Sequence, residues 1–115
     1  MDWWYDGPPR IERGQVRHTS LFLWRDEVGD EGREEVKSAF RALNDSVDRV
    51  DSLIVADNVG TLATDYDMIL DVMFEDFDDA KAFFEHQAYE EALRLAAGAT
   101  KYEWTARITH TVGLG

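Results

Sequence analysis

The chain has 115 residues, with 24 acidic against 12 basic side chains and a formal net charge of −12. A chain of this length forms one domain with a small core, and its negative charge opposes binding to nucleic acid or to anionic membrane surfaces. Cysteine is absent and no stretch approaches the roughly 20 apolar residues that span a bilayer, so we expect a cytoplasmic protein without disulfides, thiolate chemistry or a membrane partner.

The first 14 residues differ in composition from the rest. An aromatic triplet, Trp3, Trp4 and Tyr5, precedes an Asp-Gly-Pro-Pro segment that breaks regular structure. We interpret residues 1–14 as an N-terminal aromatic arm and residues 15–115 as the folded domain. The arm fits a lid over a pocket, a strap across a partner subunit or a disordered end, and its aromatic bulk favours docking on a dimer.

Two periodicities divide the remaining chain. Alternation of apolar and other residues with period two predicts strands at residues 16–24, 50–57, 66–74 and 101–112. Apolar residues three and four apart predict a helix around residues 36–47. A short helix capped by Asp76 follows the third strand, and a further helix over residues 87–97 ends at Gly98. The resulting order, β-α-β-β-α-β, predicts an α+β, ferredoxin-like fold.

Alternation also assigns residues to the two faces of the sheet. The face expected against the helices carries aromatic and titratable residues: His18, Phe22, Trp24, Tyr66, Met68, Tyr102, Trp104 and His110. The other face is expected to carry apolar residues beside a few charges: Leu21, Leu23, Leu53, Val55, Ile69 and Met73 with Arg17, Asp71, Glu103 and Arg107. That face is too apolar for exposure, so we expect it to meet a second copy in a homodimeric α/β barrel.

Three segments carry a resemblance to a known family. The histidine-bearing strand QVRHTSLFLW, the strand with its acidic turn DYDMILDVMFEDFDDAKAFF, and the segment EHQAY resemble the stress-responsive dimeric α/β-barrel (Dabb) family over roughly residues 15–112. The family includes a plant polyketide cyclase of the olivetolic acid type and a hydroxynitrile lyase. Antibiotic-biosynthesis monooxygenases share the barrel architecture. The family also includes stress-associated proteins without established catalysis. The resemblance therefore implies a dimeric α/β barrel, with small-molecule chemistry in some members.

The resemblance also marks a departure in one motif. Family members commonly read His-Pro-x-His where this chain reads His-Gln-Ala-Tyr at residues 86–89. Similarity to the cyclase carries over His18 and His86, whereas the catalytic histidine of the cyclase falls on Tyr89 and its catalytic tyrosine on Phe83. Phenylalanine cannot transfer a proton, so the mechanism of the cyclase does not carry over unchanged, and a rearranged acid/base site is left open. Some members hold a magnesium ion near the dimer interface, but no pattern here specifies one, and we expect neither metal nor cofactor.

The residues expected on the helix side favour an apolar pocket for a flat ligand with hydroxyl or carbonyl groups. A neutral imidazole can take a proton from a carbon beside a carbonyl, and a phenol can hydrogen-bond the enolate oxygen. We therefore predict His18 as the base and Tyr89 or Tyr66 as the polar residue that orients the ligand. The predicted catalytic residues are His18, Tyr89 and His86. The predicted ligand pocket is lined by Tyr66, Phe22, Trp24, Met68, Phe83 and Trp104.

Structural interpretations stay open beside these roles. His18 also fits a hydrogen-bonded core histidine, His86 a cap at the helix junction, and Tyr89 simple packing. Three functions remain: a cofactor-free cyclase or lyase acting on an aromatic, polyketide-like or β-carbonyl compound; a non-catalytic dimer that binds a small ligand or serves in a stress response; and a cofactorless monooxygenase. Only fold analogy supports the last.

Overall fold

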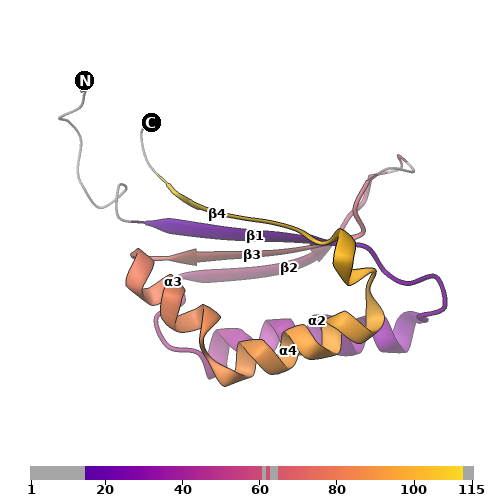
Figure 1. The fold of residues 1–115 in the computed structure, drawn as a ribbon, viewed down its shortest axis with the longest axis horizontal. Coiled ribbons are helices and arrows are strands. Elements are labelled where there is room, and N and C mark those ends of the chain that lie inside the picture. Colours follow the sequence, from indigo (N-terminus) through magenta and orange to yellow (C-terminus); the bar gives the residue numbers. More distant parts are fainter. Residues whose placement is uncertain (1–14, 61, 63–64, 113–115) are drawn as a thin grey trace.

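The computed structural model describes residues 15–60, 62 and 65–112, so the predicted aromatic arm lies outside the described residues. A four-stranded antiparallel sheet carries its helices on one face (Figure 1). The elements in chain order are β1 (Val16–Phe22), α2 (Asp30–Ser46), β2 (Ser52–Asp57), β3 (Met68–Phe74), α3 (Phe77–Phe84), α4 (Gln87–Ala99), the 3₁₀ helix η1 (Tyr102–Trp104) and β4 (Ala106–Thr111). The predicted ferredoxin-like α+β fold is confirmed.

The strand order is β2-β3-β1-β4, which places β1 and β3 at the centre of the sheet. Both central strands alternate strictly between buried and partly exposed residues, as the period of two predicted. The register sets His18 of β1 directly between Val72 of β3 and Thr109 of β4. Directly opposite residues share a face of the sheet, so this register decides which side chains surround His18.

Helices α2 and α4 run side by side beneath the sheet, and α3 covers one end of the same face (Figure 1). The buried residues of α2 include Phe40, whose ring centroid lies 5.4 Å from that of Phe22. Asp76 caps α3 as predicted, since its side chain accepts a hydrogen bond from the backbone N–H of Asp79. No helix among the described residues is long and apolar enough to cross a membrane.

The predicted end of α4 is wrong. The helix does not stop at Gly98 but continues to Ala99, with Thr100 as its C-cap. Thr100 closes the last turn because its backbone N–H and its hydroxyl both donate to the carbonyl of Ala96, at 2.9 and 2.8 Å. A side-chain hydrogen bond therefore replaces the left-handed glycine turn that often ends a helix.

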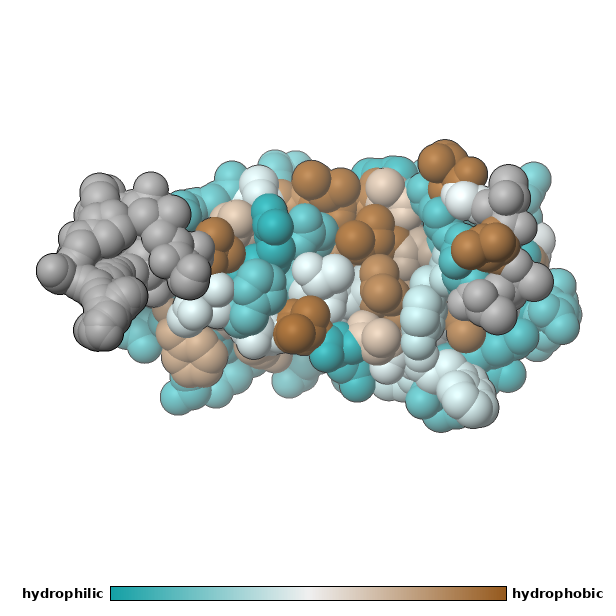
Figure 2. All heavy atoms as spheres, turned by 90° about the horizontal axis from the view of Figure 1, so that it is seen from above, coloured by the Kyte–Doolittle hydropathy of each residue, from teal (hydrophilic) through white to brown (hydrophobic). Residues whose placement is uncertain are grey.

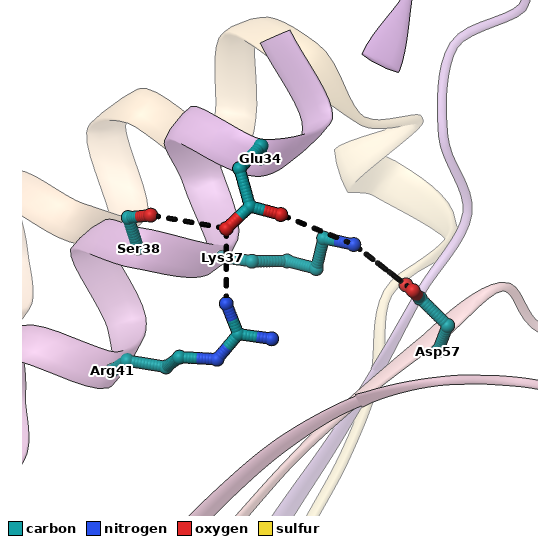
Figure 3. Close-up of polar contacts among 5 residues, drawn as sticks. All are labelled: Glu34, Lys37, Ser38, Arg41 and Asp57. Carbon is teal, nitrogen blue, oxygen red and sulfur yellow. Dashed lines mark hydrogen bonds and ion pairs between the residues drawn. The ribbon is translucent and has the colours of Figure 1, made fainter. Parts of the chain in front are cut away.

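A polar network ties α2 to the end of β2 (Figure 3). Lys37 Nζ lies 2.9 Å from the carboxylate of Asp57, and Glu34 receives Arg41 Nη1 at 3.1 Å. Ser38 also donates to Glu34, at 3.2 Å. Both cations have carboxylate partners, so this cluster positions the helix on the sheet rather than offering free charge to a ligand.

Strand β2 presents the opposite face from the one predicted. Leu53 and Val55 lie opposite Val72 and Leu70 and pack against the core, whereas Ile54 points away from the helices and is 52 % exposed. Because side chains alternate with period two, a one-residue difference in pairing moves every side chain to the other face. Sequence alternation alone did not fix this pairing.

Strand β4 is likewise inverted. It begins at Ala106 rather than Lys101, because residues 102–104 form a 3₁₀ turn in which the Thr105 N–H donates to the Tyr102 carbonyl at 3.1 Å. This interruption breaks the alternation, so Arg107 and Thr109 lie on the helix side and His110 lies on the open side. Trp104 is 64 % exposed. The predictions that Trp104 and His110 face the helices and that Arg107 faces away are wrong.

The face of the sheet without helices, here called the open face, carries apolar residues among polar ones. Figure 2 views the molecule from this side and shows hydrophobic residues gathered over the strands. The register places Leu21, Ile54, Ile69, Met73 and Ile108 there. Arg17 and Asp71 form an ion pair of 3.5 Å on the same face. Ile108 is 60 % exposed, so this surface retains apolar area that a lone subunit leaves in water.

Candidate functional site

His18 lies on the central strand β1 and faces α3 and α4, with 4 % of its surface exposed. Its Nδ1 lies 2.8 Å from the hydroxyl of Thr109, and its Nε2 lies 2.9 Å from the hydroxyl of Ser20. A hydroxyl can donate or accept, so either neutral tautomer finds one donor and one acceptor. The two hydroxyls therefore satisfy both ring nitrogens of a neutral imidazole.

Burial lowers the pKa of His18 to about 4, and the guanidinium of Arg107 acts in the same direction while the carboxylate of Asp71 opposes it. At neutral pH the ring therefore carries no charge. A neutral imidazole is the form that accepts a proton, but a low pKa also makes it a weak base.

An open cavity of about 310 Å³ lies beside His18, between the edge strand β4 and the helices. Its lining residues are His18, Phe84, Tyr89, Arg107, Ile108 and Thr109. We call it the His18 cavity. Phe84 meets the imidazole edge-on, with 4.8 Å between the ring centroids. The volume is near the lower end of the roughly 300–1,000 Å³ typical of ligand sites, so it suits a compound of about one aromatic ring.

Tyr89, in the first turn of α4, brings a phenol to the same cavity. Its ring packs against Phe83 and Phe84, with centroid distances of 4.6 and 5.9 Å. Burial raises the pKa of Tyr89 to about 12, although Arg107 acts in the opposite direction. The hydroxyl therefore stays protonated and can donate a hydrogen bond to a developing anion.

Arg107 is the cation at the cavity. Its Nη1 donates to the Tyr102 hydroxyl at 3.1 Å, and its Cζ lies 5.3 Å from the centre of the Tyr102 ring. These contacts hold the guanidinium at the edge of the cavity, on the exposed strand β4. Sequence reasoning assigned Arg107 to the opposite face.

His86 lies outside the group formed by His18, Tyr89 and Arg107. It is the N-cap of α4, and its Nδ1 accepts a hydrogen bond from the backbone N–H of Ala88 at 3.0 Å. It is not among the residues that line the His18 cavity. This geometry accounts for His86 as a capping residue.

Replacing His86 by alanine should lower the free energy of unfolding by about 1 kcal/mol, because an N–H at the helix start loses its acceptor. His86→Asn keeps a capping side chain and should restore most of that loss. Urea unfolding of the three proteins measures the effect. A His86→Ala protein with the same free energy of unfolding as the wild type would contradict the capping role.

The other predicted pocket residues do not meet at one place. Phe22, Trp24, Met68 and Phe83 are buried in the core. Tyr66 and one side of Met68 line a separate cavity of about 550 Å³ at the β2–β3 end, where the Tyr66 hydroxyl donates to the carbonyl of Trp104 at 3.1 Å. Of the three predicted catalytic residues, His18 and Tyr89 share a cavity and His86 does not line it.

Four residues near His18 were missed by sequence reasoning: Ser20, Phe84, Arg107 and Thr109. Ser20 was predictable as a partner, because it follows His18 by two residues on the same face of one strand. Arg107 and Thr109 carried no such signal, since their side of the sheet depends on the 3₁₀ turn before β4. Within the described residues, no group of three or more histidine, aspartate or glutamate side chains is arranged to hold a metal ion.

Fold and site together define a small ferredoxin-like domain with an aromatic and polar cavity between its edge strand and its helices. Residues 16–104 match the family model of the stress-responsive A/B barrel domain (Dabb). The chain belongs to this family. No match is found among curated proteins.

Solved structures show the same fold. A dimeric ferredoxin-like protein from Bacteroides fragilis is 24 % identical, with a TM-score of 0.70, over 85 % of this chain and 96 % of its own. A dimeric ferredoxin-like protein from Thermobifida fusca is 19 % identical, with a TM-score of 0.77, over 94 % and 100 %. The hydroxynitrile lyase of Passiflora edulis is 11 % identical, with a TM-score of 0.79, over 90 % and 97 %. At these identities the likeness concerns the fold.

Proposed function

We propose that this protein is a cofactor-free enzyme that performs acid/base chemistry, of the cyclisation or lyase type, on a small aromatic or β-carbonyl compound. The observation that carries the proposal is the meeting of a neutral imidazole, a protonated phenol and a guanidinium at one cavity. The fold shared with the Passiflora edulis hydroxynitrile lyase supports a lyase-type activity by analogy.

The proposed reaction begins with proton removal from a carbon beside a carbonyl. The Thr109 hydroxyl, 2.8 Å from His18 Nδ1, either turns aside or passes the proton on, and His18 becomes an imidazolium. The C–H electron pair moves into the carbonyl, and Tyr89 donates a hydrogen bond to the enolate oxygen. The imidazolium finally returns its proton to the product anion, which leaves His18 neutral again.

The low pKa of His18 restricts the substrates. An imidazole whose pKa lies at about 4 is a poor match for an ordinary ketone C–H. A carbon between two carbonyl groups is far more acidic, since two oxygens share the charge. We therefore infer that the enzyme favours β-dicarbonyl compounds, of which benzoylacetone is a convenient aromatic probe.

A screen of aromatic β-dicarbonyl compounds tests this function. Product formation and deuterium uptake from D₂O at the carbon between the carbonyls are followed by NMR for the wild type and His18→Ala. His86→Asn, which keeps a capping side chain and lies outside the cavity lining, is the matched control. Turnover that depends on His18 but not on His86 supports the proposal, whereas equal rates in all three proteins overturn it. Oxygen consumption during turnover would identify a monooxygenase instead.

One observation favours a second candidate, a non-catalytic protein that binds a small ligand. Both ring nitrogens of His18 already have hydroxyl partners within the protein, which is also what a structural histidine needs. Under this alternative the same compounds bind in the His18 cavity, but the wild type and His18→Ala take up deuterium at the uncatalysed rate. A role in a stress response remains compatible with such binding.

We also propose that the protein is a homodimer joined through the open face. Exposed Ile54 and Ile108, with the partly exposed Leu21, Ile69 and Met73, supply an apolar centre. The relatives from Bacteroides fragilis and Thermobifida fusca are described as dimeric. Burying this face against its own copy would complete an α/β barrel and supplement a small core.

Ile54→Asp should convert the dimer to a monomer. The new carboxylate would lie opposite Asp71, and burying unpaired like charges in an interface costs several kcal/mol. Sedimentation equilibrium measures the association. Phe77→Asp, an exposed residue of α3 on the helix side, is the control and should remain dimeric. An Ile54→Asp protein that stays dimeric would place the interface elsewhere.

A further inference from the structure

We propose that Arg107 favours ligands that carry a carboxylate, so that the His18 cavity binds an anionic carbonyl compound more tightly than its neutral counterpart. The inference rests on the proposed function for the location of the ligand. It goes further by naming the charge of the ligand and the residue that recognises this charge.

The guanidinium is held in place but retains donors for a ligand. One of its NH₂ groups donates to the Tyr102 hydroxyl, and its plane is supported by the Tyr102 ring. A guanidinium has five N–H donors in a rigid fork that matches a carboxylate. Fixing the group beforehand reduces the side-chain entropy lost when an anion binds.

Arg107 has no carboxylate competitor among the described residues. The ion pairs there engage Arg17, Lys37, Arg41, Arg49 and Lys101. By contrast, the cavity beside Trp24 contains Arg33 and Lys37 but also four carboxylates. The His18 cavity contains Arg107 and no acidic residue. It is therefore a positive site on a protein whose net charge is −12.

The field of Arg107 reaches the reactive groups. The guanidinium contributes to lowering the pKa of His18 and acts to lower the pKa of Tyr89. Both effects have one physical meaning, which is that positive potential in the cavity favours negative charge there. A ligand carboxylate would meet the same potential, provided that it approaches from the β4 side.

The spacing along β4 defines a second feature of the ligand. Arg107 and Thr109 are two residues apart on one face of the strand, which separates them by about 6.5 Å. A carboxylate at Arg107 therefore leaves a carbonyl near Thr109, His18 and Tyr89 if the two groups lie across about one aromatic ring. The compound 4-acetylbenzoate has this arrangement, and 4-acetylbenzamide is its neutral counterpart.

Binding of these two compounds tests the inference without requiring turnover. Isothermal titration should show that the wild type binds 4-acetylbenzoate more tightly than the amide by about fivefold to twentyfold. Arg107→Gln should abolish the difference. Arg94→Gln changes the net charge equally on the exposed side of α4 and should preserve it. Higher salt should weaken the preference.

Two results would overturn the inference: equal affinity of the wild type for the acid and the amide, or an acid preference that survives in Arg107→Gln. The proposed function can fail separately. If the preference for the acid depends on Arg107 but deuterium uptake does not depend on His18, carboxylate selection by Arg107 is supported and the proposed catalytic role of His18 is wrong. If uptake depends on His18 without any acid preference, catalysis stands and carboxylate selection is wrong.

Discussion

Lowering the pH from 7 to 4 is expected to remove up to about 3 kcal/mol of folding free energy through His18 alone. The folded pKa is about 4, against 6.5 for an ordinary histidine. Between these two pH values, His18 binds a proton in the unfolded chain but not in the folded protein. Stability is therefore fully present above pH 6.5 and decreases as the pH falls toward 4.

Urea unfolding at a series of pH values measures this dependence. Acidic residues also titrate over part of the range, so the wild type must be compared with His18→Gln, which cannot gain the proton. The difference in unfolding free energy between the two proteins should change by about 3 kcal/mol from pH 7 to pH 4. A constant difference would mean that His18 is accessible and ordinarily basic, and it would contradict the buried neutral ring.

Tyr89→Phe is expected to reduce turnover of a screened β-dicarbonyl compound by roughly 100-fold, which is typical of the loss of one hydrogen-bond donor to a developing oxyanion. The fold should persist, because phenylalanine retains the ring that packs against Phe83 and Phe84. The loss should appear in kcat, since the hydrogen bond strengthens as the enolate forms.

The matched control for this variant is Tyr66→Phe. It removes a phenol hydroxyl from the separate cavity at the β2–β3 end and should leave turnover unchanged. Unfolding measurements on both variants exclude a loss of folded protein. Equal turnover by the wild type and Tyr89→Phe would restrict Tyr89 to packing, which is the structural interpretation that the sequence left open.

Much of the fold was predictable because period-two and helical patterns are local. Val16, His18, Ser20 and Phe22 alternate inward on β1, and the same rule places Met68 to Phe74 on β3. The family segments around these strands also identified the family. Both central strands have buried neighbours on either side, so their pattern is strong.

The edge strands show where local patterns fail. β2 and β4 each have one partner strand, and their alternation is weaker. The 3₁₀ turn at residues 102–104 reverses the faces of β4, which moves Arg107 and Thr109 to His18 and takes Trp104 and His110 away. No residue type in that segment signals the turn, so period-two alternation through it assigns the wrong faces to β4.

The candidate site was only partly predictable for the same reason. His18 and Tyr89 were chosen by residue chemistry and family resemblance, and the structure places both at one cavity. Tyr66 was grouped with them only because alternation placed it on the same face of the sheet. Sharing a face of the sheet does not mean that two residues lie close together along the strands. Tyr66 lies at the other end, beside Asn58 and Val59. The resemblance likewise assigned catalysis to His86, whose ring caps α4.

The proposed function requires that small molecules bind in the His18 cavity. A ¹H–¹⁵N NMR titration of the full protein with benzoylacetone, with assigned backbone amides, tests this binding directly. We expect saturable shifts at His18, Phe84, Tyr89 and Thr109, and their loss in Tyr89→Trp, whose larger ring fills the cavity. Shifts confined to Asn58, Val59 and Tyr66, or no saturable shift at the His18 cavity, would contradict it.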